Sequence, residues 1–87
     1  MRETLREEVT VSLVFDRKTK RSLPRRIQWQ GTIYTIKTVG LHHKFKRGGT
    51  LIHVFSVVDE GDMFFRLELD TETLHWTLTE VSDGLPD

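Results

Sequence analysis

The sequence predicts a single all-β domain, folded as a small antiparallel barrel or strongly curled sheet of about six to seven strands. Its 87 residues leave room for one hydrophobic core. Apolar residues recur at every second position along most of the chain, which is typical of half-buried strands. Turn-forming residues separate these segments at intervals of roughly 8 to 12 residues, and no segment has the periodicity of an amphipathic helix. So small a sheet must curl or close to cover its apolar face and its edges.

The first half of the chain predicts strands joined by one long and one tight connection. Alternation from Glu7 to Asp16 predicts the first strand, with its apolar residues on one face. The charge density and the proline of residues 17–26 favour an exposed connection over a strand. Alternation resumes at residues 27–29, and Gly31 permits a tight turn into a strand at residues 32–37.

The second half predicts a central strand and a closing hairpin. Leu41, His43 and Phe45 are expected to face inward, leaving His42, Lys44 and Lys46 on an exposed cationic face. The glycine pair at residues 48–49 predicts a turn into residues 51–58, which are apolar on both faces. Such a strand is either covered on both sides or part of a partner interface. Alternation at residues 63–70 and 74–79 predicts the last hairpin.

Together these segments place the domain at residues 9–82, between an N-terminal tail or short helical turn at residues 1–8 and a C-terminal tail at residues 83–87. The residues expected to form the core are Val11, Leu13, Phe15, Ile27, Trp29, Phe45, Phe55, Phe65, Leu67, Leu69, Trp76 and Leu78. The charged first eight residues lack the apolar stretch of a signal peptide, and no run approaches the roughly 20 apolar residues of a membrane-spanning helix. We therefore expect a soluble cytoplasmic protein.

Charge is divided unequally along the chain, although the formal net charge is zero. No Asp or Glu occurs between Asp16 and Asp59. Residues 1–47 carry 12 bases and 4 acids, a net charge of +8, and residues 48–87 carry 1 base and 9 acids, a net charge of −8. This asymmetry indicates a charged partner surface, unless folding places the opposite charges side by side.

The segment Pro24–Ile36 resembles the opening of an uncharacterised family of small bacterial β domains: a proline, basic residues, a tryptophan, a glycine turn and a tyrosine. Residues 65–70 and 76–78 are similar to the closing hairpin of that family. The middle segment, residues 42–58, departs from the family's pattern. Members of the family occur near error-prone DNA polymerase homologues, so the resemblance implies a DNA-repair setting.

The first functional prediction is a protein-interaction or self-associating module. The positive half of one molecule would meet the negative half of another, which gives electrostatically steered association. The two-sided apolar strand at residues 51–58 would contribute to the interface. The predicted interface residues are Ile52, Val54, Val58 and Phe64.

The alternative prediction is binding of single-stranded DNA or RNA through the basic surface of residues 17–47. Cations neutralise phosphates, and aromatic rings stack on unpaired bases. This reading places the 17–26 connection and the turn at residues 44–47 on one face of the molecule. The candidate residues are Arg17, Lys18, Lys20, Arg21, Arg25, Arg26, Lys44, Lys46, Arg47 and Tyr34.

No catalytic residue, metal site, cofactor or small-molecule substrate is predicted. The serines lack a nucleophile-elbow motif, and the glycine pair lacks the remainder of a phosphate-binding loop. Four histidines are present, but His42 and His43 are consecutive and would point to opposite faces of a strand. His43 and His53 share the inward parity, so we expect them to be hydrogen-bonded residues rather than metal ligands. The predicted role is therefore binding without chemistry.

Overall fold

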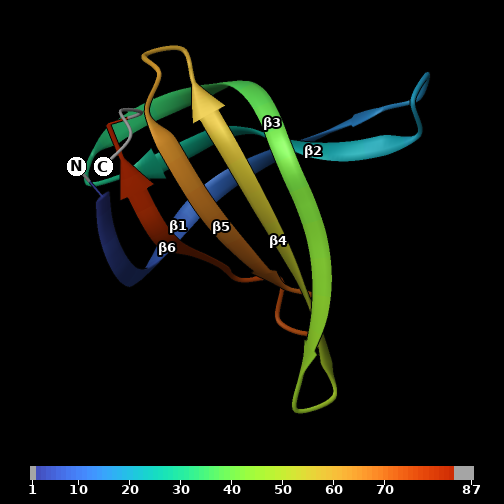
Figure 1. The fold of residues 1–87 in the computed structure, drawn as a ribbon. Helices are drawn as coiled ribbons and strands as arrows, with labels where there is room; N and C mark the ends of the chain where they lie inside the picture. Colours follow the sequence, from blue (N-terminus) through green and yellow to red (C-terminus); the bar gives the residue numbers. More distant parts are fainter. Residues whose placement is uncertain (1, 84–87) are drawn as a thin grey trace.

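The computed structural model describes residues 2–83, which form six antiparallel strands closed into a barrel in sequence order (Figure 1). The strands are β1 (Arg2–Asp16), β2 (Arg21–Trp29), β3 (Thr32–Arg47), β4 (Thr50–Asp59), β5 (Phe64–Asp70) and β6 (Trp76–Ser82). The predicted all-β fold is thus confirmed. Within the described residues, no helix is long and apolar enough to cross a membrane.

Two long strands, β1 and β3, each pair with two neighbours and so close the ring. The first part of β1 pairs with β6, and its second part, from Thr10 to Asp16, pairs with β2. In β3, residues 32–35 pair with β2, whereas residues 36–47 pair with β4. Because β2 and β3 separate in this way, two hairpins project from the barrel (Figure 1). We call them the β1–β2 arm (residues 13–24) and the β3–β4 arm (residues 41–52).

Two bulges in β3 set which side chains face the inside of the barrel. The register with β4 shifts between Ile36 and Thr38, and again between Val39 and Leu41. Each extra residue inverts the alternation of faces, so Ile36, Val39 and His42 all face the same side although they are three residues apart. His42 therefore lies opposite Phe55, on the side that we call the inner face. The prediction that Leu41, His43 and Phe45 face inward is wrong: they lie on the outer face, and His42, Lys44 and Lys46 lie on the inner face.

The core occupies the closed part of the barrel. Its buried residues are Ile27, Ile36, Phe55, Val57, Phe65, Leu67, Trp76, Leu78 and Val81. Six of the predicted core residues belong to this cluster, and Val11, Trp29 and Leu69 pack against it. The prediction is wrong for Leu13, Phe15 and Phe45, which are 41%, 60% and 38% exposed. Leu13 and Phe15 lie on the β1–β2 arm, beyond the closed part, and Phe45 lies on the outer face of the other arm.

Strands begin earlier than the sequence pattern predicts at two places. Residues from Arg2 onward belong to β1 instead of forming a tail or helical turn, because they pair with β6. The predicted connection at residues 17–26 is also wrong, since β2 starts at Arg21. Pro24 is accommodated because the register with β1 shifts beside it, and a bulge tolerates the missing N–H. Apart from Asp83, the predicted C-terminal tail lies outside the described residues.

Candidate nucleic-acid interface between the two arms

A cleft of about 350 Å³ lies between the two arms, on the inner face of β4. Its lining residues come from five strands and one turn: Leu13, Lys20, Arg21, Ser22, His42, His53, Phe55 and Leu69. Lys44 and Lys46 extend the same face of β3, because they lie opposite His53 and Leu51. This inter-arm cleft has a mainly apolar floor and a basic rim, and its volume falls in the lower range of ligand sites in proteins.

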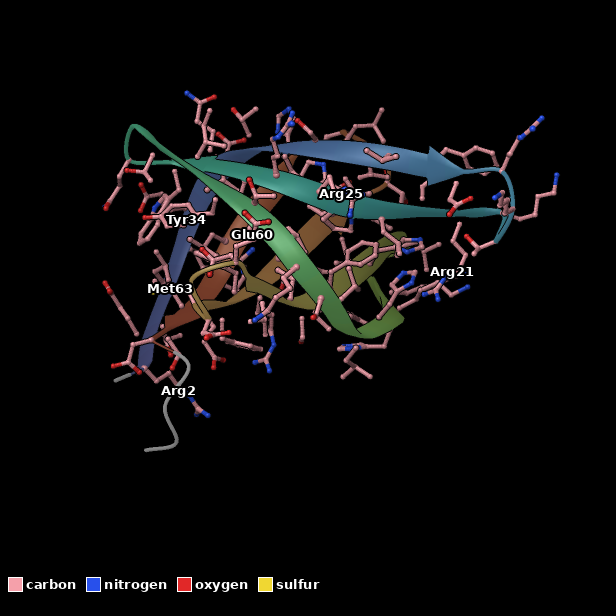
Figure 2. All side chains as sticks on the ribbon, turned by 90° about the horizontal axis from the view of Figure 1, so that it is seen from above. Arg2, Arg21, Arg25, Tyr34, Glu60 and Met63 are labelled. Atoms are coloured by element: carbon pink, nitrogen blue, oxygen red, sulfur yellow. The ribbon has the colours of Figure 1, made fainter. Side chains whose placement is uncertain are left out.

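Eight exposed cations on or beside the arms form no ion pair within the described part of the chain. They are Arg17, Lys18, Lys20, Arg21, Arg25, Arg26, Lys44 and Lys46. Six of them lie between Thr10 and Arg26, a segment with a single acid, Asp16. In Figure 2, Arg21 lies toward the β1–β2 arm, and Tyr34 lies toward the opposite end of the barrel. The arms therefore carry a concentrated positive charge.

The other two predicted nucleic-acid contacts lie elsewhere. Arg47 projects from the outer face, where its guanidinium is 3.1 Å from a carboxylate oxygen of Glu68 and 5.3 Å from the ring centroid of Phe45. The half-buried Tyr34 packs against the core, with its ring centroid 5.0 Å from that of Phe65. Neither residue lines the inter-arm cleft.

The outer face of the barrel carries ion pairs that neutralise other charged residues. Glu68 accepts hydrogen bonds from both Arg6 and Arg47. The carboxylate of Glu80 lies 2.7 Å from a guanidinium nitrogen of Arg66 and 3.0 Å from one of Arg2. Folding thus brings some of the divided charges of the sequence together on this face, and it leaves the eight cations named above without acidic partners in the described structure.

The predicted protein-interface residues are largely covered. Ile52 and Val54 are 1% and 4% exposed, whereas Val58 and Phe64 are half-buried. The apolar character of both faces of β4 therefore reflects burial on both sides within the described chain. Ile52 and Val54 therefore offer no open apolar surface, whereas Val58 and Phe64 are partly exposed.

Two histidines form the floor of the inter-arm cleft beside Phe55. His42 Nε2 and His53 Nδ1 are 2.7 Å apart, a distance at which one imidazole donates a hydrogen bond to the other. Burial lowers the pKa of both imidazoles. The charges of His53, Arg21 and Lys44 lower the pKa of His42 further. The predicted pairing of His43 with His53 on one face is wrong, because the bulge at Gly40 puts His42 there instead.

The structure also identifies exposed apolar residues that the sequence pattern assigned to the core or left unassigned. Phe15 lies opposite Ser22 on the same side of the β1–β2 arm as Leu13, next to the cations of the turn. The other side of this arm borders a second hollow of about 300 Å³. Its lining residues are Val14, Asp16, Thr19, Arg21, Leu23, Pro24, Arg25, Lys37 and Val39. Residues 13–15 are apolar without interruption, the one local sign that both sides of this hairpin are apolar.

No protein-family model, curated protein or solved structure matches this chain. The resemblance to the bacterial β-domain family therefore stays a prediction, and the geometry of the arms is the basis for interpreting the site. Within residues 2–83, no three or more side chains of the metal-binding types come together.

Proposed function

We propose that the protein binds single-stranded nucleic acid along its two arms, with the inter-arm cleft receiving part of the strand. The observation that carries this proposal is the set of eight exposed cations that lack acidic partners in the described structure. Like charges held close together repel one another, and a polyanion relieves that repulsion while releasing its own counterions. The phosphate backbone of a nucleic acid is such a polyanion.

A single strand fits the arms better than a duplex does. The exposed Phe15 ring lies on the arm that carries Lys20 and Arg21, and exposed aromatic rings beside cations stack on unpaired bases. The stacked bases of a duplex do not offer their faces to such a ring. The inter-arm cleft, at about 350 Å³, is also far too small to enclose a double helix.

Fluorescence anisotropy with labelled oligonucleotides tests this proposal. Single strands of about 12 nucleotides, a length within the usual site sizes, are compared with a duplex of the same length. The titrations are run at about 50 mM salt, where phosphate contacts are strong. We expect the single strands to bind more tightly than the duplex. Absence of binding to every oligonucleotide refutes the proposal, and tighter binding of the duplex refutes its single-strand part.

A matched pair of variants tests the location of the site. Lys20→Ala combined with Arg21→Ala removes two unpaired cations of the cleft rim, and we expect affinity to fall at least about tenfold at low salt. Lys37→Ala removes a cation that is already neutralised by Asp62, whose carboxylate oxygen lies 2.6 Å from Nζ. This control should change affinity less than about twofold. If the double variant loses no more affinity than Lys37→Ala does, the binding surface lies elsewhere.

Self-association is the second candidate, and the exposed apolar side chains of the arms favour it. Leu13, Val14, Phe15 and Leu41 are all exposed, and residues 21–24 of β2 pair with β1 but not with β3. A strand edge with apolar neighbours is a template for pairing with a second chain. Light scattering over a concentration and salt series tests this candidate. A monomer under all conditions refutes it.

A further inference from the structure

We propose that His42 and His53, together with Arg21 and Lys44, form a seat for one phosphate group in the inter-arm cleft, and that phosphate binds there more tightly as the solution becomes more acidic. The ligand is a phosphate of the bound strand or of a free nucleotide. This inference rests on the proposed function, because it assigns a ligand and a regulation to the same cleft.

The two imidazoles are held in place before any ligand arrives. The His42 ring stacks on Phe55, with the ring centroids 4.1 Å apart and the planes 12° from parallel. The His53 ring is also nearly parallel to Phe55, at 17°, and Phe55 itself is only 2% exposed. The hydrogen bond between the two histidines also fixes how each ring is turned within its own plane. A ligand therefore meets imidazole rings that are already fixed in position, and ordering them costs less free energy than ordering exposed lysines.

Every charged group that faces these histidines is positive. The β1–β2 arm contributes Lys20 and Arg21, and β3 contributes Lys44 and Lys46. The remaining cleft-lining residues, from β1, β2, β4 and β5, are uncharged, and no Asp or Glu lines the cleft. His43, on the outer face of β3, adds a further unfavourable interaction with protonated His42. An anion is the ligand that this arrangement favours.

The same arrangement couples phosphate binding to proton uptake. Burial, which has the largest effect, and the neighbouring positive charges hold the pKa of His42 below its usual value; burial and then Lys44 do the same for His53. A bound phosphate accepts hydrogen bonds from the rings and opposes the positive potential, so it raises both pKa values. Linkage requires that protonation strengthen phosphate binding by the same free energy. Affinity thus rises as pH falls through the pKa of the occupied site, and levels off below the pKa of the empty site.

One proton is expected to be taken up with each phosphate. The first proton converts the neutral hydrogen bond into a charge-assisted one between an imidazolium and an imidazole. A second proton would put hydrogens on both nitrogens, which are only 2.7 Å apart, and would break that bond. The expected limit is therefore a tenfold change in affinity per pH unit, the value for one proton.

Imidazole NMR spectra of the unmodified protein test the seat directly. The histidine signals are followed from about pH 5 to pH 8, with and without inorganic phosphate, a mononucleotide or a single-stranded oligonucleotide. We expect each ligand to move the titration midpoints of His42 and His53 upward. A response to the oligonucleotide alone identifies the strand as the source of the phosphate, and a response to the smaller ligands extends the seat to free phosphates. Unchanged midpoints with all three ligands overturn the proposal.

Matched variants separate this inference from the proposed function. His42→Gln removes one imidazole of the pair and should abolish the pH dependence of oligonucleotide binding. His43→Gln changes the neighbouring residue on the outer face and should preserve that dependence. Oligonucleotide binding that is insensitive to pH overturns the phosphate seat but leaves the proposed function intact. Conversely, a response to inorganic phosphate without oligonucleotide binding refutes the proposed function but leaves the phosphate seat intact.

Discussion

The salt dependence of oligonucleotide binding is the most quantitative prediction of this structure. Four unpaired cations line or flank the inter-arm cleft: Lys20 and Arg21 line it, and Lys44 and Lys46 lie on the same face of β3 as His42. Each phosphate neutralised on a single strand contributes about −0.7 to the slope of log K against log salt, so four contacts give a slope of about −2.8. Affinity should therefore fall about 50-fold between roughly 50 and 200 mM salt.

The double variant Lys44→Ala, Lys46→Ala removes half of these contacts. Its slope should be about −1.4, and its affinity should fall only about sevenfold over the same salt range. Anisotropy titrations at several salt concentrations measure both slopes, and Lys37→Ala serves as the control because its partner Asp62 already neutralises it. An unchanged slope in the double variant shows that Lys44 and Lys46 do not contact phosphate. A wild-type slope near zero refutes the electrostatic basis of the proposed function.

Three further predictions concern the stability of the barrel. Phe65→Ala empties the fully buried centre of the core and should cost about 3–5 kcal/mol in urea unfolding followed by tryptophan fluorescence, whereas Ile33→Ala, at an exposed site, should cost less than about 0.5 kcal/mol; similar losses would contradict the assigned core. Gly31→Ala puts a side chain at φ +77° and should lower stability by about 1 kcal/mol, measured by thermal unfolding; no loss would argue against this turn geometry. Backbone N–H groups of the following turn lower the pKa of Asp70 in the folded state. The carboxylate of Asp70 therefore stabilises the fold above its unfolded-state pKa, and this stabilisation is lost as pH falls through the lower folded-state pKa. Asp70→Asn should make the melting temperature less dependent on pH in this acidic range. An unchanged pH dependence would refute the role assigned to Asp70.

The sequence predicts buried side chains best where the strands form the closed part of the barrel. In β5, Phe65 and Leu67 alternate with polar residues and are fully buried, as the period of two predicts. In β1 the same alternation continues through Leu13 and Phe15, although that part of the strand has left the closed barrel. Alternation identifies one face of a strand. It contains no information on where the opposing sheet ends.

Inward and outward faces are hardest to predict in β3. Gly40 indicates a bend, but nothing local marks Lys37 as the second extra residue. Each bulge is defined by the register with β4, which depends on residues about 20 positions away along the chain. The sequence therefore identifies the cationic and apolar faces of residues 41–47 correctly as two sets and assigns them to the wrong sides.

The face that a cation of β3 occupies also decides whether a carboxylate neutralises it. Arg47 and Lys46 are neighbours in the same acid-free segment, and the sequence treats them alike. Arg47 faces outward, where Glu68 lies on the same surface and neutralises it. Lys46 faces the inner side, opposite Leu51, where no carboxylate lines the cleft. Without the bulge at Gly40, the alternation from His42 to Lys46 would be reversed, and Lys44 and Lys46 would share the outer face with Glu68. The bulge thus separates Lys44 and Lys46 from the carboxylates of the outer face, and this separation leaves both without an acidic partner in the described structure.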